Sequence, residues 1–307
     1  MREFELQGLD GSNLLGFLAS LGVLRVLTIP SADADVRMKW VRSGGWVPVI
    51  LHSRIDDREE LIEMLAQRVC GERSINAAWE IGDDLTLSSR EFGALLRLHA
   101  MEAQPQRRET ADYLAAFGSE AIGSGPKKEQ MSDTEFRTMS GAGHQHFLGF
   151  MKDLAIGTEP EDLRRALFET WDYADPRPSL RWDPADYRPH ALRAEDPSGD
   201  PIKTMRGANR LAIEALPLFP TVPIGRQLRT VAFQDRSGET EITWPIWSEP
   251  LRVETVASLL ADAEIQAGEI QRGARSSLAR RNIAQVFRAK RFTDGKYRNF
   301  SPSRSLM

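Results

Sequence analysis

The pattern of apolar and polar residues near the N-terminus predicts a strand, a buried helix and a hairpin. Residues 3–9 alternate as a short strand does. The turn Asp10-Gly-Ser-Asn13 follows, and it offers Ser12 or Asn13 as an N-cap. Residues 14–27 are apolar nearly all round, which predicts a helix that is buried on several sides. Residues 36–40 and 46–51 flank a Ser-Gly-Gly turn and are typical of a β-hairpin.

The rest of the pattern is mainly helical. Helical spacing predicts helices at about 57–70, 89–102, 143–156, 160–172, 209–216 and 253–272, with a further basic helix that ends at about Lys290. Residues 228–233 and 241–247 are predicted to form a strand pair. The Gly-, Ser- and Lys-rich residues 118–133 are expected to form a mobile loop. Six prolines between residues 174 and 201 predict a long irregular loop, a kind of segment that is often functional.

This order of elements indicates an α+β fold. The strand pairs have short connections and the helices cluster, whereas a doubly wound parallel sheet would alternate strands with helices. We expect two parts. Residues 1–250 form a mixed α/β body with short antiparallel strand pairs and the proline-rich loop near 174–201, and residues 251–307 form a helical, strongly basic C-terminal segment.

Composition restricts the class of protein. A length of 307 residues fits one large domain or two ordinary ones. The single cysteine, Cys70, excludes a disulfide framework and a cysteine-built zinc site, and its apolar surroundings predict a buried structural thiol. The longest apolar run, residues 14–27, is too short to span a bilayer. We therefore expect a cytoplasmic protein with no membrane association.

The charge is strongly polarised along the chain. Residues 1–271 carry a net charge of −13, whereas residues 272–307 hold ten Lys or Arg residues and one acid, a net charge of +9. Concentrated positive charge suits a polyanion, because neutralising phosphates releases condensed counterions. The predicted contacts to a nucleic-acid backbone are Arg272, Arg275, Arg280, Arg281, Arg288, Lys290 and Arg291. The alternative is a solvated basic helix with no ligand.

Three further groups of residues are candidates. The glycine turn at Gly141 and Gly143 precedes a predicted helix, where free backbone N–H groups could hold a phosphate; an ordinary helix start is the alternative. Lys203 and Arg206 form a second basic edge. The proline-rich loop carries Arg177, Arg181, Arg188 and Arg193 with Trp182 and Tyr187, which could face nucleic acid or pair with the loop's own aspartates.

Catalytic signatures are missing from the sequence. There is no G-x-S-x-G, no Walker sequence and no G-x-G-x-x-G turn, which disfavours an ordinary hydrolase, kinase or dehydrogenase. His144 and His146 lack the spacing of a known metal motif, and we expect neither a metal nor a cofactor. The sequence therefore indicates a protein without catalysis of its own.

Five stretches together resemble one family. They are residues 9–24 (LDGSNLLGFLASLGVL), 140–147 (SGAGHQHF), 179–184 (SLRWDP), 206–212 (RGANRLA) and 244–247 (WPIW). In this order they resemble the large-subunit family of type I CRISPR interference (Cascade-type) complexes, subtype I-U or I-G. The resemblance implies a non-catalytic subunit with guide RNA, target DNA and the other subunits of the complex as partners. It also implies recognition of a short DNA motif that flanks the target, and recruitment of a helicase-nuclease.

The leading hypothesis is thus an RNA-guided, nucleic-acid-binding subunit in antiviral defence. Two alternatives remain open. One is a metal-dependent nuclease that uses His144 or His146 with nearby aspartates. The other is a scaffold protein whose basic tail docks on an acidic protein partner.

Overall fold

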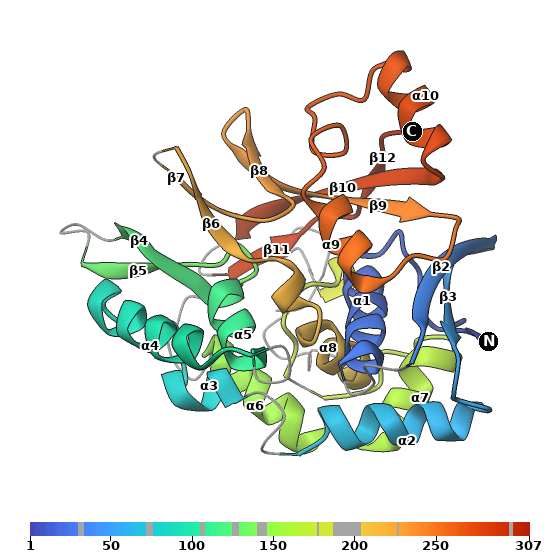
Figure 1. The fold of residues 1–307 in the computed structure, drawn as a ribbon, viewed down its shortest axis with the longest axis horizontal. Helices are drawn as coiled ribbons and strands as arrows, with labels where there is room; N and C mark the ends of the chain where they lie inside the picture. Colours follow the sequence, from blue (N-terminus) through green and yellow to red (C-terminus); the bar gives the residue numbers. More distant parts are fainter. Residues whose placement is uncertain are drawn as a thin grey trace, which may run out of the picture.

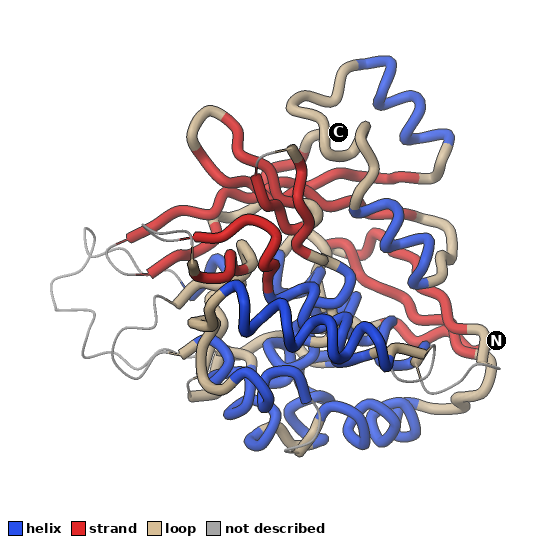
Figure 2. Tube along the Cα trace, turned by 60° about the vertical axis from the view of Figure 1, so that its left-hand side comes forward, coloured by secondary structure: helices blue, strands red, loops and turns tan. Residues whose placement is uncertain are grey.

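Antiparallel sheets packed on a layer of helices form the structure, a computed structural model (Figure 1). It describes residues 1–29, 34–71, 76–104, 108–124, 129–139, 146–176, 178–186, 204–225, 227–294 and 297–307. In Figure 2 most strands lie in the upper part and on the right, most helices lie in the lower part, and one helix stands at the top beside the C-terminus. Every strand pair among the described residues is antiparallel, which confirms the predicted α+β class. None of the described helices is both long enough and apolar enough to cross a membrane.

The N-terminal sheet confirms the predicted hairpin and buried helix. Its strands, in the order β1-β3-β2, are β1 (Arg2–Glu5), β2 (Val36–Ser43) and β3 (Gly45–His52). Helix α1 (Leu14–Thr28) is buried along most of its length. Asn13 caps α1, because its side chain accepts a hydrogen bond from the Gly16 N–H at 3.2 Å.

The helical layer lies below the sheets in Figure 1. It comprises α2 (Arg58–Val69), α3 (Asn76–Ile81), α4 (Ser89–Glu102), α5 (Glu109–Phe117), α6 (Phe147–Gly157), α7 (Pro160–Phe168) and α8 (Arg206–Ile213). Among the described residues after α7, short 3₁₀ turns lie at Pro184–Asp186 and Leu216–Leu218. Helices α1 and α8 approach closely, since a Cβ atom on Gly22 would lie 1.9 Å from the Leu211 carbonyl oxygen.

The C-terminal sheet corrects two sequence predictions. The helix predicted at 253–272 ends much earlier, as α9 (Val253–Leu260). The basic helix predicted up to Lys290 is helical only in α10 (Arg272–Arg280), because the chain from Ile283 onward forms strand β10 (Ile283–Asp294). Strand β10 pairs with β9 (Glu239–Trp247), β11 (Tyr297–Phe300) and β12 (Arg304–Ser305), and β8 (Phe233–Arg236) flanks β9. Long-range pairing with β9 outweighs the helical propensity of the Ala, Gln, Arg and Lys residues in this segment. The pair β9–β10 also spans the predicted boundary near residue 250.

Two hairpins extend beside this sheet (Figures 1 and 2). Residues 118–133, expected as a loop, contain β4 (Gly118–Ser124) and β5 (Gln130–Asp133). Strand β6 (Thr221–Ile224) pairs with β7 (Gln227–Thr230). The predicted partner of residues 241–247 is therefore displaced, because β8 takes the place next to β9 and β7 turns back onto β6.

Tryptophan side chains pack the N-terminal sheet, α1 and β9 into one core. Trp40 of β2 packs edge-on against Trp247 of β9, and Phe17 of α1 lies between Trp40 and Trp244. The Trp244 indole N–H donates to the Gly11 carbonyl at 2.8 Å, and that of Trp247 donates to the Met38 carbonyl at 2.7 Å. A buried indole needs such a partner, so these bonds fix the N-terminal sheet to β9.

His52 gives the fold a pH-sensitive point. Its ring is fully buried, Nδ1 accepts from the backbone N–H groups of Arg54 and Ile55, and burial lowers the pKa of the imidazole. The unfolded chain therefore binds a proton at a higher pH than the folded chain does. We expect the contribution of His52 to the free energy of unfolding to be constant above about pH 6.5, the pKa of a free histidine, and to fall as the pH drops below it.

Urea denaturation at pH 7.5 and pH 5.5 checks this expectation. The variant His52→Asn keeps a side-chain acceptor near the position of Nδ1 but has no proton to take up. Its stability should change less between the two pH values than that of the wild type. An equal change in both proteins would assign the acid sensitivity to other groups.

Candidate nucleic-acid interface

One face of the C-terminal sheet is charged and the other is apolar. The register places Arg236 opposite Glu239, Glu241 opposite Lys290, Thr243 opposite Arg288, and Arg288 opposite Arg304. Because side chains alternate across a strand, these residues share one face. The intervening residues of β9 and β10 face the core, and they include Ile242, Trp244, Phe287 and Ala289.

A single buried carboxylate lies at the centre of the charged face. Glu241 is 4% exposed. Its Oε2 lies 3.5 Å from Arg236 Nε and 3.7 Å from Arg288 Nη1, and its Oε1 lies 3.4 Å from Arg304 Nη2. Three guanidinium groups thus share one carboxylate, which leaves two positive charges that Glu241 does not neutralise.

Arg288 is buried and holds a loop over this face. Its Nη1 and Nη2 donate to the carbonyl oxygens of Gly268 and Ala267 at 2.7 and 2.5 Å, and its Nε donates to Thr243 Oγ1 at 2.8 Å. Burial, followed by the nearby Arg236 guanidinium, lowers the pKa of Arg288 to about 10, although Glu241 opposes the effect. A depressed arginine pKa indicates excess positive charge in a poorly solvated place. The prediction of Arg288 as an exposed backbone contact is therefore corrected: only 1% of it is accessible.

The charged face forms the floor of a cleft of about 820 Å³, which we call the arginine cleft. The described residues that line it include five bases and three acids, an excess of two positive charges. These are Arg236, Arg275, Arg288, Lys290, Arg304, Glu239, Glu241 and Glu269. Lys290 forms an ion pair with Glu239, so the excess is concentrated on the arginines.

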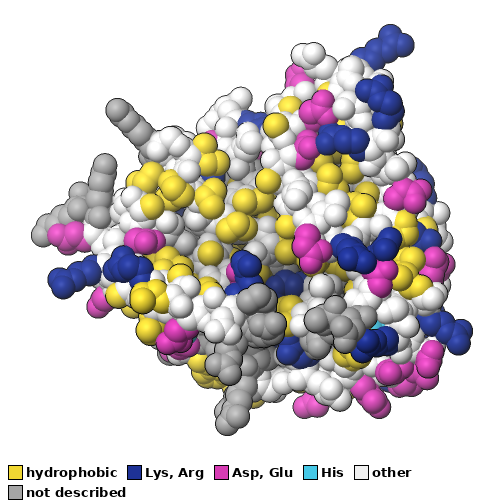
Figure 3. All heavy atoms as spheres, in the orientation of Figure 1, with side chains coloured by type: hydrophobic (Ala, Val, Ile, Leu, Met, Phe, Trp, Pro, Cys, Tyr) yellow, Lys and Arg dark blue, Asp and Glu magenta, His cyan; other side chains and the backbone are white. Residues whose placement is uncertain are grey.

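Helix α10 stands beyond the cleft and carries its own cations. Arg272 and Arg280 are exposed, and neither forms an ion pair within the described ranges of the chain. Arg281, at the C-cap, is paired with Asp262 and Glu264 at 2.6 Å each. Figure 3 shows Lys and Arg side chains at the tip of the molecule where Figure 1 places α10, with acidic side chains beside them.

Of the other predicted contacts, Arg275 lies in the cleft, and the rest lie apart from it or outside the described residues. Arg275 lines the cleft and donates to the Leu306 carbonyl at 3.0 Å. Arg291 donates to the Glu135 carbonyl at 2.7 Å, and Arg206, at the start of α8, donates to the Gly157 carbonyl at 3.2 Å. Lys203, Gly141 and Gly143 fall outside the described residues. The structure thus brings together Arg275, Arg288 and Lys290, and it does not bring Arg206 to them.

The proline-rich loop is described only in part. Arg177, Arg188, Arg193 and Tyr187 lie outside the described residues. Trp182 is buried and donates to the Phe136 carbonyl at 3.0 Å, so it packs in the core and does not present a stacking surface. Arg181 donates to Asn299 Oδ1 at 3.2 Å, which ties the loop to β11.

The histidine pair is also described only in part, because His144 falls outside the described residues. His146 precedes α6, and its Nδ1 lies 3.9 Å from Asp84 Oδ2, an atom that already accepts a hydrogen bond from Arg137 at 2.7 Å. Among the described residues, no group of three or more His, Cys, Asp or Glu side chains is arranged to hold a metal ion.

The sequence analysis did not predict the buried carboxylate of Glu241 or two of its arginine partners, Arg236 and Arg304. Part of the signal is present in the sequence, since Asp235-Arg-Ser-Gly238 is typical of a tight turn, and such a turn places Arg236 opposite Glu239. Polar Glu239, Glu241 and Thr243 also alternate with apolar neighbours on β9. The place of Arg304 next to Arg288 depends on the pairing of β12 with β10, which no local pattern indicates.

Four of the five stretches that carry the sequence resemblance are connected by hydrogen bonds between buried or partly buried groups. Asn13 Nδ2 donates to Asp183 Oδ1 at 3.0 Å, and the Tyr173 hydroxyl donates to Asp183 Oδ2 at 3.1 Å. Asn209 Oδ1 accepts from the Leu180 N–H at 3.0 Å. Together with the Trp244–Gly11 bond, these contacts connect the stretches at residues 9–24, 179–184, 206–212 and 244–247. Their residues hold the fold together around α1.

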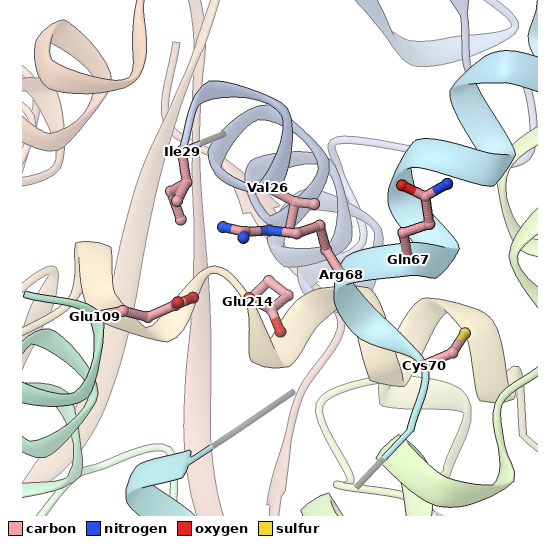
Figure 4. A pocket seen from close by; sticks show the side chains of 7 residues that line it. All are labelled: Val26, Ile29, Gln67, Arg68, Cys70, Glu109 and Glu214. Carbon is pink, nitrogen blue, oxygen red and sulfur yellow. The ribbon is translucent and has the colours of Figure 1, made fainter. Parts of the chain in front are cut away.

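A second, smaller cavity of about 190 Å³ lies between α1, α2 and α8 (Figure 4). Val26 and Ile29 line one side, and the Arg68 side chain extends across it toward Glu109 and Glu214. Burial raises the pKa of the Cys70 thiol at its edge, which keeps the thiol protonated and unreactive. This agrees with a structural thiol, although Cys70 is only partly buried.

Comparison with known proteins adds no family assignment. No protein-family model matches the chain, and no curated protein sequence matches it.

Proposed function

We propose that this protein is a non-catalytic, nucleic-acid-binding subunit of an RNA-guided CRISPR surveillance complex. In this role it contacts the phosphate backbone of guide RNA or target DNA in the cytoplasm, beside the other subunits and the helicase-nuclease that they recruit. The observation that carries the proposal is the arginine cleft, where three guanidinium groups share the buried carboxylate of Glu241. The resemblance of the five sequence stretches supports the choice of complex.

The charge distribution supports a polyanion as the ligand. Uncompensated cations in a partly enclosed cleft raise the local concentration of anions and speed their association. Arg272 and Arg280 on α10 extend the positive surface from the cleft into solvent. Contacts from these arginines to phosphate groups carry no sequence information, so binding through such contacts would be independent of sequence.

Charge reversal on α10 tests the proposal. The double variant Arg272→Glu, Arg280→Glu should weaken binding to single-stranded RNA of any sequence, because two phosphate contacts are lost. The slope of log K against log salt should become shallower by about 1.4 for a single strand. Fluorescence anisotropy at several salt concentrations measures both quantities.

A matched control separates local contacts from net charge. Arg2 and Arg252 are exposed on the N-terminal sheet and before α9, and each forms an ion pair with an aspartate. The double variant Arg2→Glu, Arg252→Glu has the same net charge as the α10 variant and should bind almost as the wild type does. Equal losses in both variants, or no loss in the α10 variant, would remove α10 from the proposal.

A basic surface can also serve a protein partner, as the scaffold alternative holds. Purified protein would then show salt-sensitive binding to an acidic protein and no affinity for RNA or DNA in the same anisotropy assay. That result would reject the nucleic-acid proposal.

A further inference from the structure

We propose that the arginine cleft binds a phosphomonoester dianion, and that its source is the terminal phosphate of a nucleic-acid strand. The assignment of the strand as the source rests on the proposed function. The affinity of the cleft for a phosphomonoester does not, and the experiment below treats the two separately.

The first argument is charge. The lining has an excess of two positive charges among its described residues. A phosphomonoester carries about −1.5 to −2 at neutral pH, since its second pKa is about 6. An internal phosphodiester carries one negative charge. Only the terminal group neutralises the excess with a single ligand.

The second argument is that hydrogen-bonding groups around Glu241 are left unpaired. Arg236 Nε and Glu241 Oε2 are both buried, and neither has a hydrogen-bond partner among the described residues. The three guanidinium groups stand 3.4–3.7 Å from the carboxylate, which is ion-pair distance and longer than a good charge-assisted hydrogen bond. An unpaired buried donor costs free energy until a ligand satisfies it.

The third argument is that the three arginines around Glu241 differ in how firmly their side chains are held. Arg288 is fixed by three acceptors, so it supplies a rigid positive floor. Arg236 donates to the Gln266 carbonyl, which fixes it from the side of the loop. Arg304 is different, because its side chain is 60% exposed and its one described contact is the 3.4 Å approach to Glu241. Its planar fork can turn toward a phosphate with two parallel hydrogen bonds.

The fourth argument is space. The cleft volume of about 820 Å³ falls within the usual range for small-molecule sites, roughly 300–1,000 Å³. It can therefore hold a terminal nucleotide as well as its phosphate. Lys290 and Glu239 form a half-exposed ion pair beside Glu241, so these two side chains neutralise each other and leave the excess positive charge on the arginines.

The experiment compares two single-stranded RNAs of one sequence, one with a 5′ phosphate and one with a 5′ hydroxyl, together with the same pair modified at the 3′ end. For the wild type we expect the phosphorylated strand to bind about tenfold more tightly at one of the two ends, as one charge-assisted bidentate contact allows. The preference should shrink at pH 5.5, where the phosphate becomes a monoanion.

Variants assign the preference to the cleft. Arg304→Gln should reduce the ratio of the two affinities to about one, because it weakens binding of the phosphorylated strand far more than binding of the hydroxyl strand. Glu241→Gln should increase the ratio, because it removes the carboxylate that competes for the arginines. Arg272→Glu, Arg280→Glu should weaken both strands equally and keep the ratio. Arg252→Gln, an exposed arginine outside the cleft, is the matched control and should change neither value.

Calorimetry with inorganic phosphate and adenosine monophosphate separates the two sources. Binding of these small ligands by the wild type and not by Arg304→Gln, with no binding of RNA, would keep the dianion site and overturn the nucleic-acid source. RNA binding with a ratio of one in the wild type, and no heat with phosphate or nucleotide, would overturn the inference while the proposed function stands. No binding of any of these ligands would overturn both.

Discussion

Replacing Glu214 with alanine should lower the free energy of unfolding by about 3–5 kcal/mol, the usual cost of removing one partner of a buried ion pair. Glu214 is 2% exposed. Arg210 Nη2 donates to its Oε1 at 2.7 Å, and Arg25 Nη1 and the Tyr113 hydroxyl donate to its Oε2 at 3.1 and 2.7 Å. The substitution leaves two arginines buried without their shared carboxylate.

Urea denaturation of a series of variants measures this effect. Tyr113→Phe removes one hydrogen bond to the same carboxylate and should cost about 1 kcal/mol. Glu109→Ala removes a carboxylate that is 44% exposed and 3.6 Å from Arg25, and it should cost less than Glu214→Ala. A loss below 1 kcal/mol for Glu214→Ala would show that water from the adjoining 190 Å³ cavity solvates the arginines.

The second large effect is expected at Gly22. A Cβ atom there would lie 1.9 Å from the Leu211 carbonyl oxygen and 2.8 Å from its carbon, so α1 and α8 would have to separate. Gly22→Ala should destabilise the protein by at least about 2 kcal/mol, because overpacking of a rigid core exceeds the gain in helix propensity.

The same substitution at Gly273 provides the control. This glycine lies in α10, and a Cβ atom would meet nothing within 4 Å. Gly273→Ala should therefore be neutral or stabilising by up to about 1 kcal/mol. Thermal denaturation measures the melting temperatures of Gly22→Ala and Gly273→Ala. Similar melting temperatures would mean that α1 and α8 are packed less closely than the structure shows.

The local sequence pattern predicts an element correctly where the formation of that element depends on its own residues. Asn13 caps α1 as predicted, and the Ser-Gly-Gly turn produces the β2–β3 hairpin. The local pattern gave the wrong element for residues 283–290, because Arg, Lys, Ala and Gln are good helix formers. The strand observed there depends on pairing with β9, more than 35 residues earlier in the chain. Ile283, Val286 and Phe287 were the available signs of a strand.

The candidate site also depends on long-range pairing that the local sequence pattern does not reveal. Counting charges located a basic C-terminus, yet it could not show that Arg288 is buried or that Arg281 is neutralised by Asp262 and Glu264. The cleft depends on Arg236 and Glu241, which lie in the part of the chain that is acidic overall. A site built by cross-strand pairing is invisible to a linear charge count, because its members come from four separate segments of the chain.

The packing of α1 and the N-terminal sheet against β9 affects when this protein can fold during its synthesis. Ser303 donates to the Ser12 carbonyl at 2.6 Å, and the tryptophans of β9 cover α1 and the N-terminal sheet. A ribosome releases the N-terminus first, so α1 and β2 emerge long before β9 and β10 exist to cover them. The nascent chain therefore carries a partly uncovered apolar helix until β9 and β10 have been synthesised, and we expect a chaperone, or a partner assembled during translation, to shield it in that interval.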